Sequence, residues 1–522
     1  MTIITKSALT APMTRRGALA TFGAGAAGAG LLTLTGGARA ATPKRGGDLK
    51  VAVSRGSTSD SLDPTTYTDW NTYMVGAAVC NNLVEIGPDK VPVPELATSW
   101  EASDDAKVWT FELRQGVEFH NGKTFTSADV IYSLNRHRGE DSTSPAAPFM
   151  KAVSDVRADG DYTVIVELSE GNAELPIVMG LFQLTIIPDG YDDFSTLVGT
   201  GGYMIESFDP GVSVSFSRNP NYWKTDRAWV DTVEFLTIID PTSRINALLT
   251  GQVHAIDRVD AKTLPRILRN PNFFLVENRG ALYQSSAMDS RVAPFSDNNV
   301  RTALKYAVNR QELLDKINNG YGVIGNDHPV PPNDPNYNSD IPQRPYDPDQ
   351  AKFWLKKSGL ESLDVPLSAA DTAFTGAVDA AVLFKEHAEP GGINVEVVRE
   401  PNDGYWSNVW MKKPWSMVNW GVRATPTIMF EIAYSCGAPW ADGYYCNDRF
   451  QQLLTEVKTT TDPALRKEML GEMQLIQHEQ GSNHVFLFVS ALDVYSADVG
   501  DVVEDAAGAM MGTRIAERAW MV

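Results

Sequence analysis

The stretch VPVPELATSWEASDDAKVWTFELRQGVEFHNGKTFTSADVIYSL (residues 91–134) contains the clearest secondary-structure pattern in the chain. Between Val108 and Arg114, the large apolar side chains of Trp109, Phe111 and Leu113 alternate with mostly polar ones. A period of two places the apolar side chains on one face of an extended segment. The sequence therefore predicts a half-buried β-strand here.

Turn-forming residues flank this strand, with Asp104-Asp105 before it and Gln115-Gly116 after it. A second short strand is expected over Val117–Phe119, and it leads into Asn121-Gly122, a pair that favours tight turns. We interpret the unit as a β-hairpin. A helix should follow, capped by Thr126 or Ser127.

The segment GVEFHNGKT (116–124) is similar to a phosphate-binding loop, but we reject that interpretation. Five residues separate Gly116 from Gly122 where a phosphate loop has four, and part of the segment is expected to be a strand. His120 has no partner at metal-ligand spacing, so we expect a structural hydrogen bond and no metal site.

The first 40 residues are interpreted as an export signal peptide. Lys6, Arg15 and Arg16 precede an uncharged run, and Ala38-Arg39-Ala40 offers small residues for cleavage after Ala40. The Arg15-Arg16 pair resembles a twin-arginine signal, although Ala18 stands where such signals usually have Phe, so the general secretory route stays open. The run is too short and glycine-rich to favour a membrane anchor. With no Cys at the cleavage site, we expect a soluble periplasmic protein.

Charge and length narrow the class of protein further. The formal charge is −20, and it becomes −24 without the first 40 residues, which carry four basic and no acidic side chains. Such a chain is repelled by nucleic acid and by anionic membranes, so neither is expected as a partner. The length exceeds one core and suggests roughly three substructures of about 150 residues each.

Strand-like and helix-like patterns alternate through the rest of the chain, which favours an α/β fold. One well-formed amphipathic helix is expected over Asn299–Asn309, with Arg301, Lys305 and Arg310 facing outward into solvent. The proline-rich stretch Asp327–Asp349 is expected to be a surface excursion.

The chain resembles the bacterial extracellular solute-binding proteins of family 5, the dipeptide, oligopeptide and nickel group of ABC importer components. The resemblance rests on a proline-leucine entry, a Ser-Trp pair, a Trp-Thr-Phe-x-Leu-Arg strand, a Phe-His-x-Gly turn and an Ala-Asp-Val helix start. These motifs are Pro94–Ala97, Ser99-Trp100, Trp109–Arg114, Phe119–Gly122 and Ala128–Val130. Further matches are Ser61–Pro64, Gly199–Tyr203, Arg218–Trp223 and Asn299–Arg310.

The resemblance implies a two-lobed periplasmic-binding-protein fold of the large cluster C type, with a split first lobe and a hinge near residues 282 and 492. It also implies a small solute or short peptide as ligand, an ABC permease with its ATPases as partner, and a monomer without catalytic residues, cofactor or metal. The expected organisation is an export signal at 1–40, lobe I part a at 41–86, lobe I part b at 87–197, part a continued at 198–282, lobe II at 283–492 and a return to lobe I at 493–522.

An aromatic stretch between Glu400 and Glu431 is the best candidate for a ligand wall, and it includes Tyr405, Trp406 and Trp420. Aromatic side chains at this density either fill a core or line a pocket. In peptide-binding members of the family, an Asp that pairs with the ligand's α-amino group follows the matching Trp.

Here Arg423 lies at or next to the place of that Asp. A guanidinium suits a carboxylate and not an ammonium group, so we predict a carboxylated ligand read by Arg423, with an apolar or ring portion on Trp420 or Trp406. The alternative is a structural ion pair of Arg423 with an acidic neighbour such as Glu431.

Three further residues are weaker ligand-binding candidates. Tyr67 and Trp70 would line the cleft wall if the family match holds, or would otherwise belong to a surface loop. Asp289 could bind a cationic group of the ligand or be a simple turn carboxylate.

The three cysteines divide into a pair and a single residue. Cys436 and Cys446 enclose the turn-rich GAPWADGYY, and family members carry a bridge in this region, so we predict a disulfide in an oxidising compartment. Two reduced buried thiols are the alternative. Cys80, in an apolar run, is expected to be a small buried hydrophobic residue.

Enzymatic patterns are weak. His478-Glu479 resembles the start of a zinc-peptidase helix, but His484 lies six residues beyond His478 where four are needed. No Gly-x-Ser-x-Gly elbow is present. The alternatives to peptide binding that remain are an oligosaccharide or metal chelate as ligand, a peptide chaperone, or a hydrolase that acts on peptides or glycosides.

Overall fold

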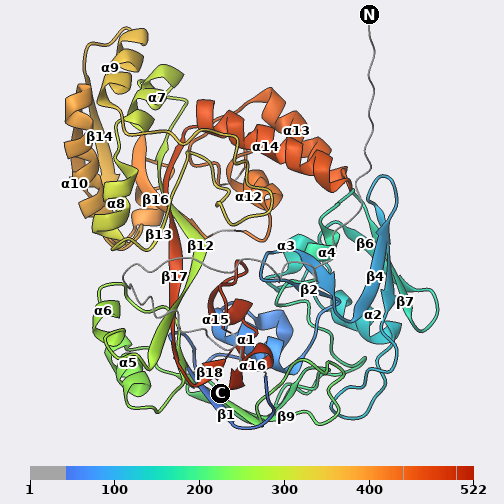
Figure 1. The fold of residues 1–522 in the computed structure, drawn as a ribbon. Helices are drawn as coiled ribbons and strands as arrows, with labels where there is room; N and C mark the ends of the chain where they lie inside the picture. The colour runs from blue at the N-terminus through green and yellow to red at the C-terminus, as the bar shows by residue number, and fades with distance from the viewer. Residues whose placement is uncertain (1–42, 422, 439, 501) are drawn as a thin grey trace, which may run out of the picture. The chain divides into compact units, whose positions relative to one another are not determined.

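Two long antiparallel strands, β12 (Phe273–Met288) and β17 (Asn483–Ser496), run side by side through the protein (Figure 1). They form the middle of an 11-stranded sheet. One half of this sheet belongs to lobe I and the other half to lobe II, so the two strands connect the lobes. The protein therefore has the two-lobed α/β fold that the sequence predicts.

The structure is a computed structural model that describes residues 43–421, 423–438, 440–500 and 502–522. These residues belong to one compact unit, 43–522. The predicted export signal, 1–40, lies outside the described residues. Within the described ranges, every helix is too short or too polar to cross a membrane.

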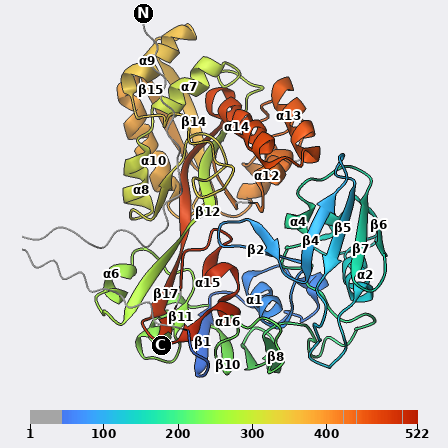
Figure 2. The same cartoon turned by 45° about the vertical axis from the view of Figure 1, so that its right-hand side comes forward.

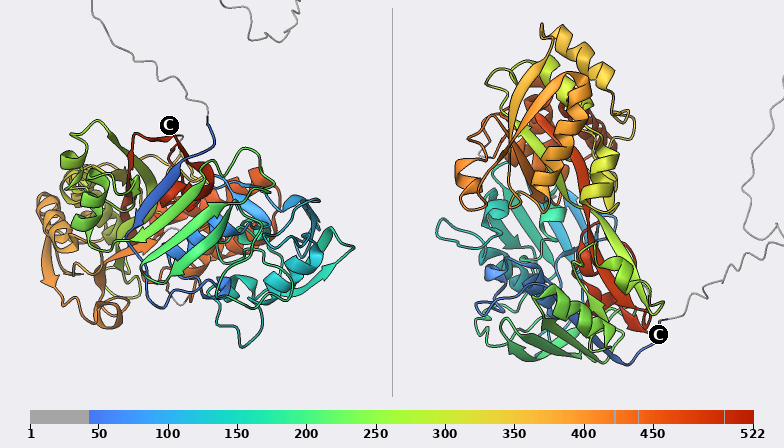
Figure 3. Two further views of the ribbon diagram at one scale, coloured as in Figure 1. Left: turned by 90° about the horizontal axis from the view of Figure 1, so that it is seen from below. Right: turned by 90° about the vertical axis from the view of Figure 1, so that its left-hand side faces the viewer.

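Lobe I packs helices on both faces of its part of the central sheet (Figure 3). Its strands and flanking helices are β1 (Asp48–Val53), β8 (Tyr203–Asp209), β9 (Ser213–Arg218), β10 (Thr232–Thr237), β11 (Ala255–Ile256), α1 (Trp70–Val79), α5 (Pro241–Leu249) and α6 (Leu264–Ile267). The order is β17-β11-β1-β10-β9-β8, and only the pairs of β1 with β10 and β11 are parallel. Val51 packs with Met74 of α1, and the next residue, Ala52, packs with Leu248 of α5. Successive side chains of β1 therefore fill two different cores, as the period of two requires.

A second sheet of lobe I, with the order β4-β5-β7-β6, lies beside the part of lobe I that contains the central sheet (Figure 2). The elements of this part are β2 (Val84–Ile86), β3 (Pro92–Pro94), β4 (Ala97–Ala102), β5 (Val108–Leu113), α2 (Ser127–Asn135), α3 (Ala147–Met150), β6 (Val153–Ala158), β7 (Thr163–Leu168) and α4 (Leu175–Val178). The strand predicted from the alternating pattern is β5, and Trp109, Phe111 and Leu113 are buried on one of its faces. This part of the secondary-structure prediction is confirmed.

The predicted hairpin, however, pairs the wrong segments. β5 pairs with β4 across the turn at Asp104-Asp105 and with β7 on its other side. Val117–Phe119 forms only a single bridge, between Glu118 and Thr124, because both edges of β5 are already occupied. The helix cap is Thr126, whose backbone N–H donates to Asp129 at 2.8 Å.

Lobe II contains the other half of the central sheet, in the order β15-β14-β16-β12-β17. Its elements are α7 (Asn298–Tyr306), α8 (Arg310–Ile317), β13 (Gly322–Ile324), α9 (Pro348–Lys357), β14 (Leu363–Ala369), α10 (Ala377–Ala388), β15 (Ile393–Arg399), α11 (Tyr405–Asn408), β16 (Trp415–Gly421), α12 (Pro426–Ala433), α13 (Asp448–Thr459) and α14 (Pro463–Gln480). The chain then returns through β17 to lobe I, where it ends with β18 (Val499–Gly500), α15 (Ala509–Gly512), α16 (Ile515–Arg518) and β19 (Trp520–Met521).

The outward orientation predicted for Arg301, Lys305 and Arg310 is wrong, because all three side chains are buried. Lys305 donates to the carbonyl oxygens of Gln477 and His478 at 3.2 and 3.1 Å, and Arg301 donates to that of Gln480 at 2.7 Å. These carbonyls belong to the last turn of α14, where a helix has no internal donors left. Charged residues on α7 therefore satisfy a neighbouring helix end and do not face solvent.

The two connecting strands change register where they pass between the lobes. The pairing of β12 with β17 is interrupted between Asn278 and Leu282, and Gly280 there has a φ of 72°, a left-handed conformation that glycine adopts without strain. Asn278 donates to Asp493 of β17 at 2.8 Å beside this break. The apolar cores of lobe II use residues between 283 and 488, on one side of the break only.

Candidate ligand-binding site

A cavity of about 310 Å³ lies between the two lobes. Lobe I supplies part of α1, the chain around the break in β12 and the C-terminal segment 506–514, whereas lobe II supplies Arg423, Ala424 and Ile428. The volume is at the lower end of the range of about 300–1,000 Å³ found for small-molecule sites. A ligand bound here would contact both lobes.

One wall of the cavity is aromatic. Trp70 and Tyr73 lie one turn apart on α1, and Phe182 packs against both, with ring centroids 5.6 Å from Trp70 and 4.7 Å from Tyr73. Asp69 caps this helix by accepting from the backbone N–H groups of Asn71 and Thr72. The cap fixes the first turn of the helix, and so it fixes the position of Trp70.

The charged residues of the lining are all cationic, and among the described residues no Asp or Glu lines the cavity. The five cations are Lys90, Arg258, Arg279, Arg423 and Arg514. A concave surface lined by charges of one sign concentrates counter-ions, so this cavity attracts anions although the chain as a whole is acidic.

Three of these cations have close carboxylate partners. Arg279 lies 2.9 Å from Glu504, and Lys90 lies 3.7 Å from Asp334. Arg514 lies 2.9 Å from Glu95. Their charges are largely compensated within the protein.

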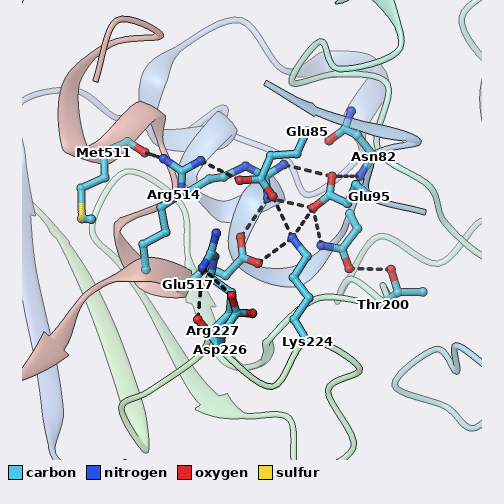
Figure 4. A network of polar contacts seen from close by, with 12 residues as sticks. Asn82, Glu85, Glu95, Thr200, Lys224, Asp226, Arg227, Met511, Arg514 and Glu517 are labelled. Atoms are coloured by element: carbon cyan, nitrogen blue, oxygen red, sulfur yellow. Dashed lines mark hydrogen bonds and ion pairs between the residues drawn. The ribbon is translucent and has the colours of Figure 1, made fainter. Parts of the chain in front are cut away.

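Arg514 belongs to a buried network that we call the glutamate cluster, which is drawn in Figure 4. It consists of Glu85, Glu95 and Glu517 with Lys224, Arg514 and Arg518. The Lys224 ammonium lies 2.8–2.9 Å from all three glutamates. The glutamates are close enough together to hold a metal ion, but Lys224 already occupies the position that a cation would take.

The charges of this cluster stabilise one another. Burial acts to raise the pKa of Glu517, but Lys224 and Arg514 outweigh it and lower this pKa to about 2. Burial likewise acts to lower the pKa of Lys224, and the glutamates reverse the effect and raise it. Glu517 and Lys224 therefore stay ionised at neutral pH, and the ion pairs of the cluster hold Arg514 at the cavity wall.

Arg423 differs from these paired cations. Its guanidinium donates to the carbonyl of Gly421 at 3.1 Å and lies over the Trp420 ring, with 5.8 Å from Cζ to the centroid. No described carboxylate lies within 4 Å of it, and the alternative partner Glu431 pairs with Lys458 instead, at 2.8 Å. Burial lowers the pKa of Arg423. The side chain is placed to receive an anion in the cavity.

The predicted aromatic candidates other than Trp70 lie outside the cavity lining. Tyr67 is fully buried and donates to the carbonyl of Leu62 at 3.0 Å. Tyr405 is buried in the core of lobe II and donates to the carbonyl of Met417 at 2.7 Å. These two hydroxyl groups are used inside the fold.

Trp420, Trp406 and Asp289 also lie outside this lining. Trp420 is buried and donates to Asp442 at 3.1 Å, whereas Trp406 is 41% exposed and packs edge-on against Trp410. Asp289 forms an ion pair with Arg291 at 2.8 Å. Of the seven candidates, the structure brings Trp70 and Arg423 together at one cavity.

The sequence interpretation missed Tyr73, Phe182 and Arg258, which all line the cavity. Tyr73 follows Trp70 by three residues, and helical periodicity gives a signal for it once a helix is assigned there. Phe182 and Arg258 lie in irregular segments without a periodic pattern, so no local signal points to them.

The predicted disulfide between Cys436 and Cys446 is present, with the two Cα atoms 4.9 Å apart. It closes the loop that carries Asp442, which accepts hydrogen bonds from both Trp410 and Trp420. Cys80 is buried, as expected. The disulfide therefore supports the strand end from which Arg423 enters the cavity.

One buried carboxylate joins the lobes beside the cavity. Glu174, just before α4, accepts hydrogen bonds from the hydroxyls of Thr425 at 2.6 Å and Thr427 at 2.8 Å, and it pairs with Arg466. Burial raises the pKa of Glu174. These contacts hold the start of α12, two residues after Arg423, against lobe I. The two lobes are therefore in contact beside the cavity.

The family model described as "Bacterial extracellular solute-binding proteins, family 5 Middle" matches residues 91–439. The dipeptide-binding protein of Escherichia coli (strain K12) is 24% identical over 505 residues, which cover 88% of this chain and 92% of that protein. A glutathione-binding protein from Pectobacterium atrosepticum is 27% identical over 318 residues, which cover 60% of this chain and 61% of that protein.

Solved structures show the same fold. The structure of HbpA2 from Haemophilus parasuis superposes with a TM-score of 0.80 at 20% identity, and the match covers 88% of this chain and 98% of that one.

Proposed function

The chain belongs to the bacterial extracellular solute-binding proteins of family 5, and we propose that it captures a peptide or peptide-like carboxylated solute between its two lobes and delivers it to the permease of an ABC importer. The observation that carries this proposal is Arg423, a cation without a described carboxylate partner at the wall of the interlobe cavity. Guanidinium and carboxylate groups form paired, charge-assisted hydrogen bonds, so a ligand carboxylate is the natural partner.

The shape and polarity of the cavity support the same ligand class. Trp70, Tyr73 and Phe182 offer an apolar surface for a side chain or ring, while the charged lining is cationic. The proteins matched above include relatives named for dipeptides and glutathione, which are carboxylated peptides. A carboxylated conjugate with an apolar portion fits both walls.

Capture is proposed to work by closure. We place the pivot near residues 282 and 492, where β12 and β17 cross between the lobes, and we divide lobe I into the segments 41–86, 87–197, 198–282 and 493–522. A ligand that contacts both lobes binds the closed form more tightly than the open form, and it shifts the population by this difference in affinity. The closed form is the one proposed to dock on the permease.

The compartment and the oligomeric state follow from this function. We propose that residues 1–40 direct export, that the mature protein acts in the periplasm as a monomer, and that it carries out no catalysis. Turnover of peptides or glycosides by the purified protein would contradict the last point.

The proposal is tested with the protein from Ala41 onward in a thermal-shift screen against carboxylated amino-acid conjugates, dipeptides, uncharged oligosaccharides and metal chelates. A ligand at a hundred times its dissociation constant adds about 2.7 kcal/mol to the stability. Carboxylated compounds should raise the melting temperature. A shift by uncharged sugars alone would contradict the carboxylate assignment.

Calorimetry on two variants then tests Arg423 itself. Arg423→Gln should weaken binding of the best carboxylated compound about 10- to 100-fold, since one charge-assisted hydrogen-bonding pair is lost. Arg291→Gln is the matched control, because Arg291 is an exposed arginine of lobe II outside the cavity lining. Equal affinities for the two variants would show that Arg423 does not contact the ligand.

A further inference from the structure

A second arginine of the cavity also lacks a strong carboxylate partner. Arg258 follows β11 in lobe I, and its side chain is 39% exposed. The one described carboxylate within 4 Å of it is Asp257, at 3.9 Å. Asp257 already accepts from the backbone N–H and the hydroxyl of Ser54, both at 2.7 Å, and lies 3.7 Å from Arg244. Arg258 therefore has hydrogen-bonding capacity left for a ligand.

The backbone of Arg258 is held in a conformation that is unfavourable for a residue with a side chain. Its φ is 47°, in the left-handed region. The next residue, Val259, donates its N–H to Leu492 of β17 at 2.8 Å, and the N–H of Arg258 faces Asp493 at 3.4 Å. Strained conformations of this kind gather at functional sites, where the surrounding structure maintains them.

The two arginines without close partners come from opposite lobes. Arg258 belongs to lobe I, and Arg423 lies between β16 and α12 of lobe II, yet both line one cavity. We propose, on the basis of the function given above, that the ligand carries two anionic groups and no ammonium group, and that it bridges Arg258 and Arg423. The ligand class is then a dicarboxylate amino-acid conjugate with its apolar portion against Trp70, Tyr73 and Phe182.

The absence of an ammonium group follows from the lining. Among the described residues, the cavity lining offers no Asp or Glu to receive a positive charge, and two of its five cations, Arg258 and Arg423, lack a close carboxylate partner. An ammonium group placed there would be repelled and would lose its hydration without compensation. A bridging dianion, in contrast, compensates one charge in each lobe and stabilises the closed form directly.

The test uses three probes that share a phenylalanine carboxylate and differ at one end. N-glutaryl-phenylalanine is a dianion, N-pentanoyl-phenylalanine replaces its second carboxylate by a methyl group, and γ-glutamyl-phenylalanine keeps both carboxylates and adds an ammonium group. Calorimetry on the protein from Ala41 onward should give at least about tenfold tighter binding for the dianion than for either other probe.

Two variants separate a binding role of Arg258 from a structural one. Arg258→Gly removes the side chain and suits the left-handed backbone, so the variant should melt at the wild-type temperature or higher. In this variant the preference for the dianion over the pentanoyl probe should fall to about onefold, whereas Arg423→Gln should weaken both probes and keep the preference. A dianion preference that persists in Arg258→Gly overturns the proposal, as does a wild-type protein that binds the two probes equally.

The outcomes also distinguish this inference from the proposed function. If the pentanoyl probe binds through Arg423 and the second carboxylate adds nothing, the carboxylate function stands and the dianion inference fails. If all three probes leave the protein unchanged while an uncharged sugar stabilises it, both fail.

Discussion

The glutamate cluster of lobe I and a second buried charge cluster in lobe II keep charges inside the protein in different ways. We call the second group the Asp327 cluster; it comprises Asp327 with Lys305, Arg310, Arg344, His328, His478 and His484. The glutamate cluster sets three carboxylates against three cations. The Asp327 cluster has one carboxylate, which lies 2.8 Å from both Arg310 and Arg344.

Basic groups outnumber carboxylates around Asp327. This is tolerated because several of the basic groups are uncharged or donate hydrogen bonds to carbonyl oxygens at the end of a helix. Burial lowers the pKa of His478 to about 4 and that of Lys305 to about 7. Arg344 and Lys305 also donate to the last carbonyls of α14, where the helix dipole is negative. Carboxylates balance the cations in one lobe, whereas loss of protons and a helix end balance them in the other.

This comparison predicts its largest effect for Asp327→Asn. The substitution removes the single carboxylate that faces two buried guanidinium groups, and breaking a buried pair in this way costs about 4 kcal/mol. Urea unfolding of the variant should show this loss in the free energy of unfolding. Asp340→Asn, at an exposed position of the same segment, is the control and should stay within about 0.5 kcal/mol of the wild type. A loss below about 1 kcal/mol for Asp327→Asn would mean that the helix end alone compensates the arginines.

A somewhat smaller loss is expected for Lys224→Met in the glutamate cluster. Three glutamates would remain with Arg514 and Arg518, and Arg518 also pairs with Asp505 at 2.7 Å, so at least one negative charge would be left uncompensated, at a cost of about 3 kcal/mol. The same unfolding measurement applies. Since Arg514 lines the cavity, the variant should also be checked for binding of N-glutaryl-phenylalanine. A stability equal to that of the wild type would show that the cluster does not depend on Lys224.

The two clusters should also respond to acid in different pH ranges. His478 has a native pKa of about 4, below its ordinary value of 6.5, so the unfolded state takes up the proton first and stability falls between pH 6.5 and 4. Glu517 has a native pKa of about 2 against an ordinary 4.5, so its contribution to the free energy of unfolding is lost between pH 4.5 and 2. The Asp327 cluster should therefore weaken before the glutamate cluster on acidification.

His478→Gln tests this order. The imidazole lies 3.0 Å from both Arg344 and the carbonyl of Asn326, and a glutamine amide offers the same acceptor and donor without titrating. Between pH 7 and 4.5, the free energy of unfolding of the variant should fall by about 2 kcal/mol less than that of the wild type. Hydrogen exchange in β14 reports on lobe II, and an equal loss of protection in the variant and the wild type would contradict the assignment to His478.

The smallest effect is expected for Lys305→Met. Lys305 has a native pKa of about 7 against an ordinary 10.5, so its protonated form is only weakly favoured. The variant loses two hydrogen bonds to carbonyls and should be destabilised by about 1 kcal/mol at pH 7, much less than Lys224→Met. Between pH 7 and 10.5 the Lys305 side chain is neutral in the native state but still protonated in the unfolded state, so its contribution to wild-type stability should rise with pH. This contribution should be absent in the variant. A larger loss than for Lys224→Met would mean that Lys305 is charged in the native protein.

Local patterns predicted much of the fold. The alternating residues of β5, the Thr126 cap of α2 and the disulfide between Cys436 and Cys446 all depend on residues that are close in the sequence. Periodicity also predicted the helix over 299–309, which corresponds to α7 (Asn298–Tyr306). The resemblance to a known family then supplied the two-lobed arrangement.

The candidate site was predicted less completely. Arg423 lines the cavity, but the aromatic wall comes from Trp70, Tyr73 and Phe182 and not from Trp406 or Trp420. The reason is that Trp420 donates its indole N–H to Asp442 inside lobe II. Residue spacing alone does not show which way a side chain points at the end of a strand.

The amino-acid sequence thus determined the elements whose stability is local, since caps, alternation and short disulfide loops act over a few residues. Tertiary contacts decided which charges are buried, which are paired and which remain available to a ligand. Arg514 is neutralised by Glu95, 419 residues away, and Thr425 is held by Glu174, 251 residues away. Local sequence patterns do not predict such pairs, because these interactions become strong only when segments that are distant in the sequence pack together and exclude water.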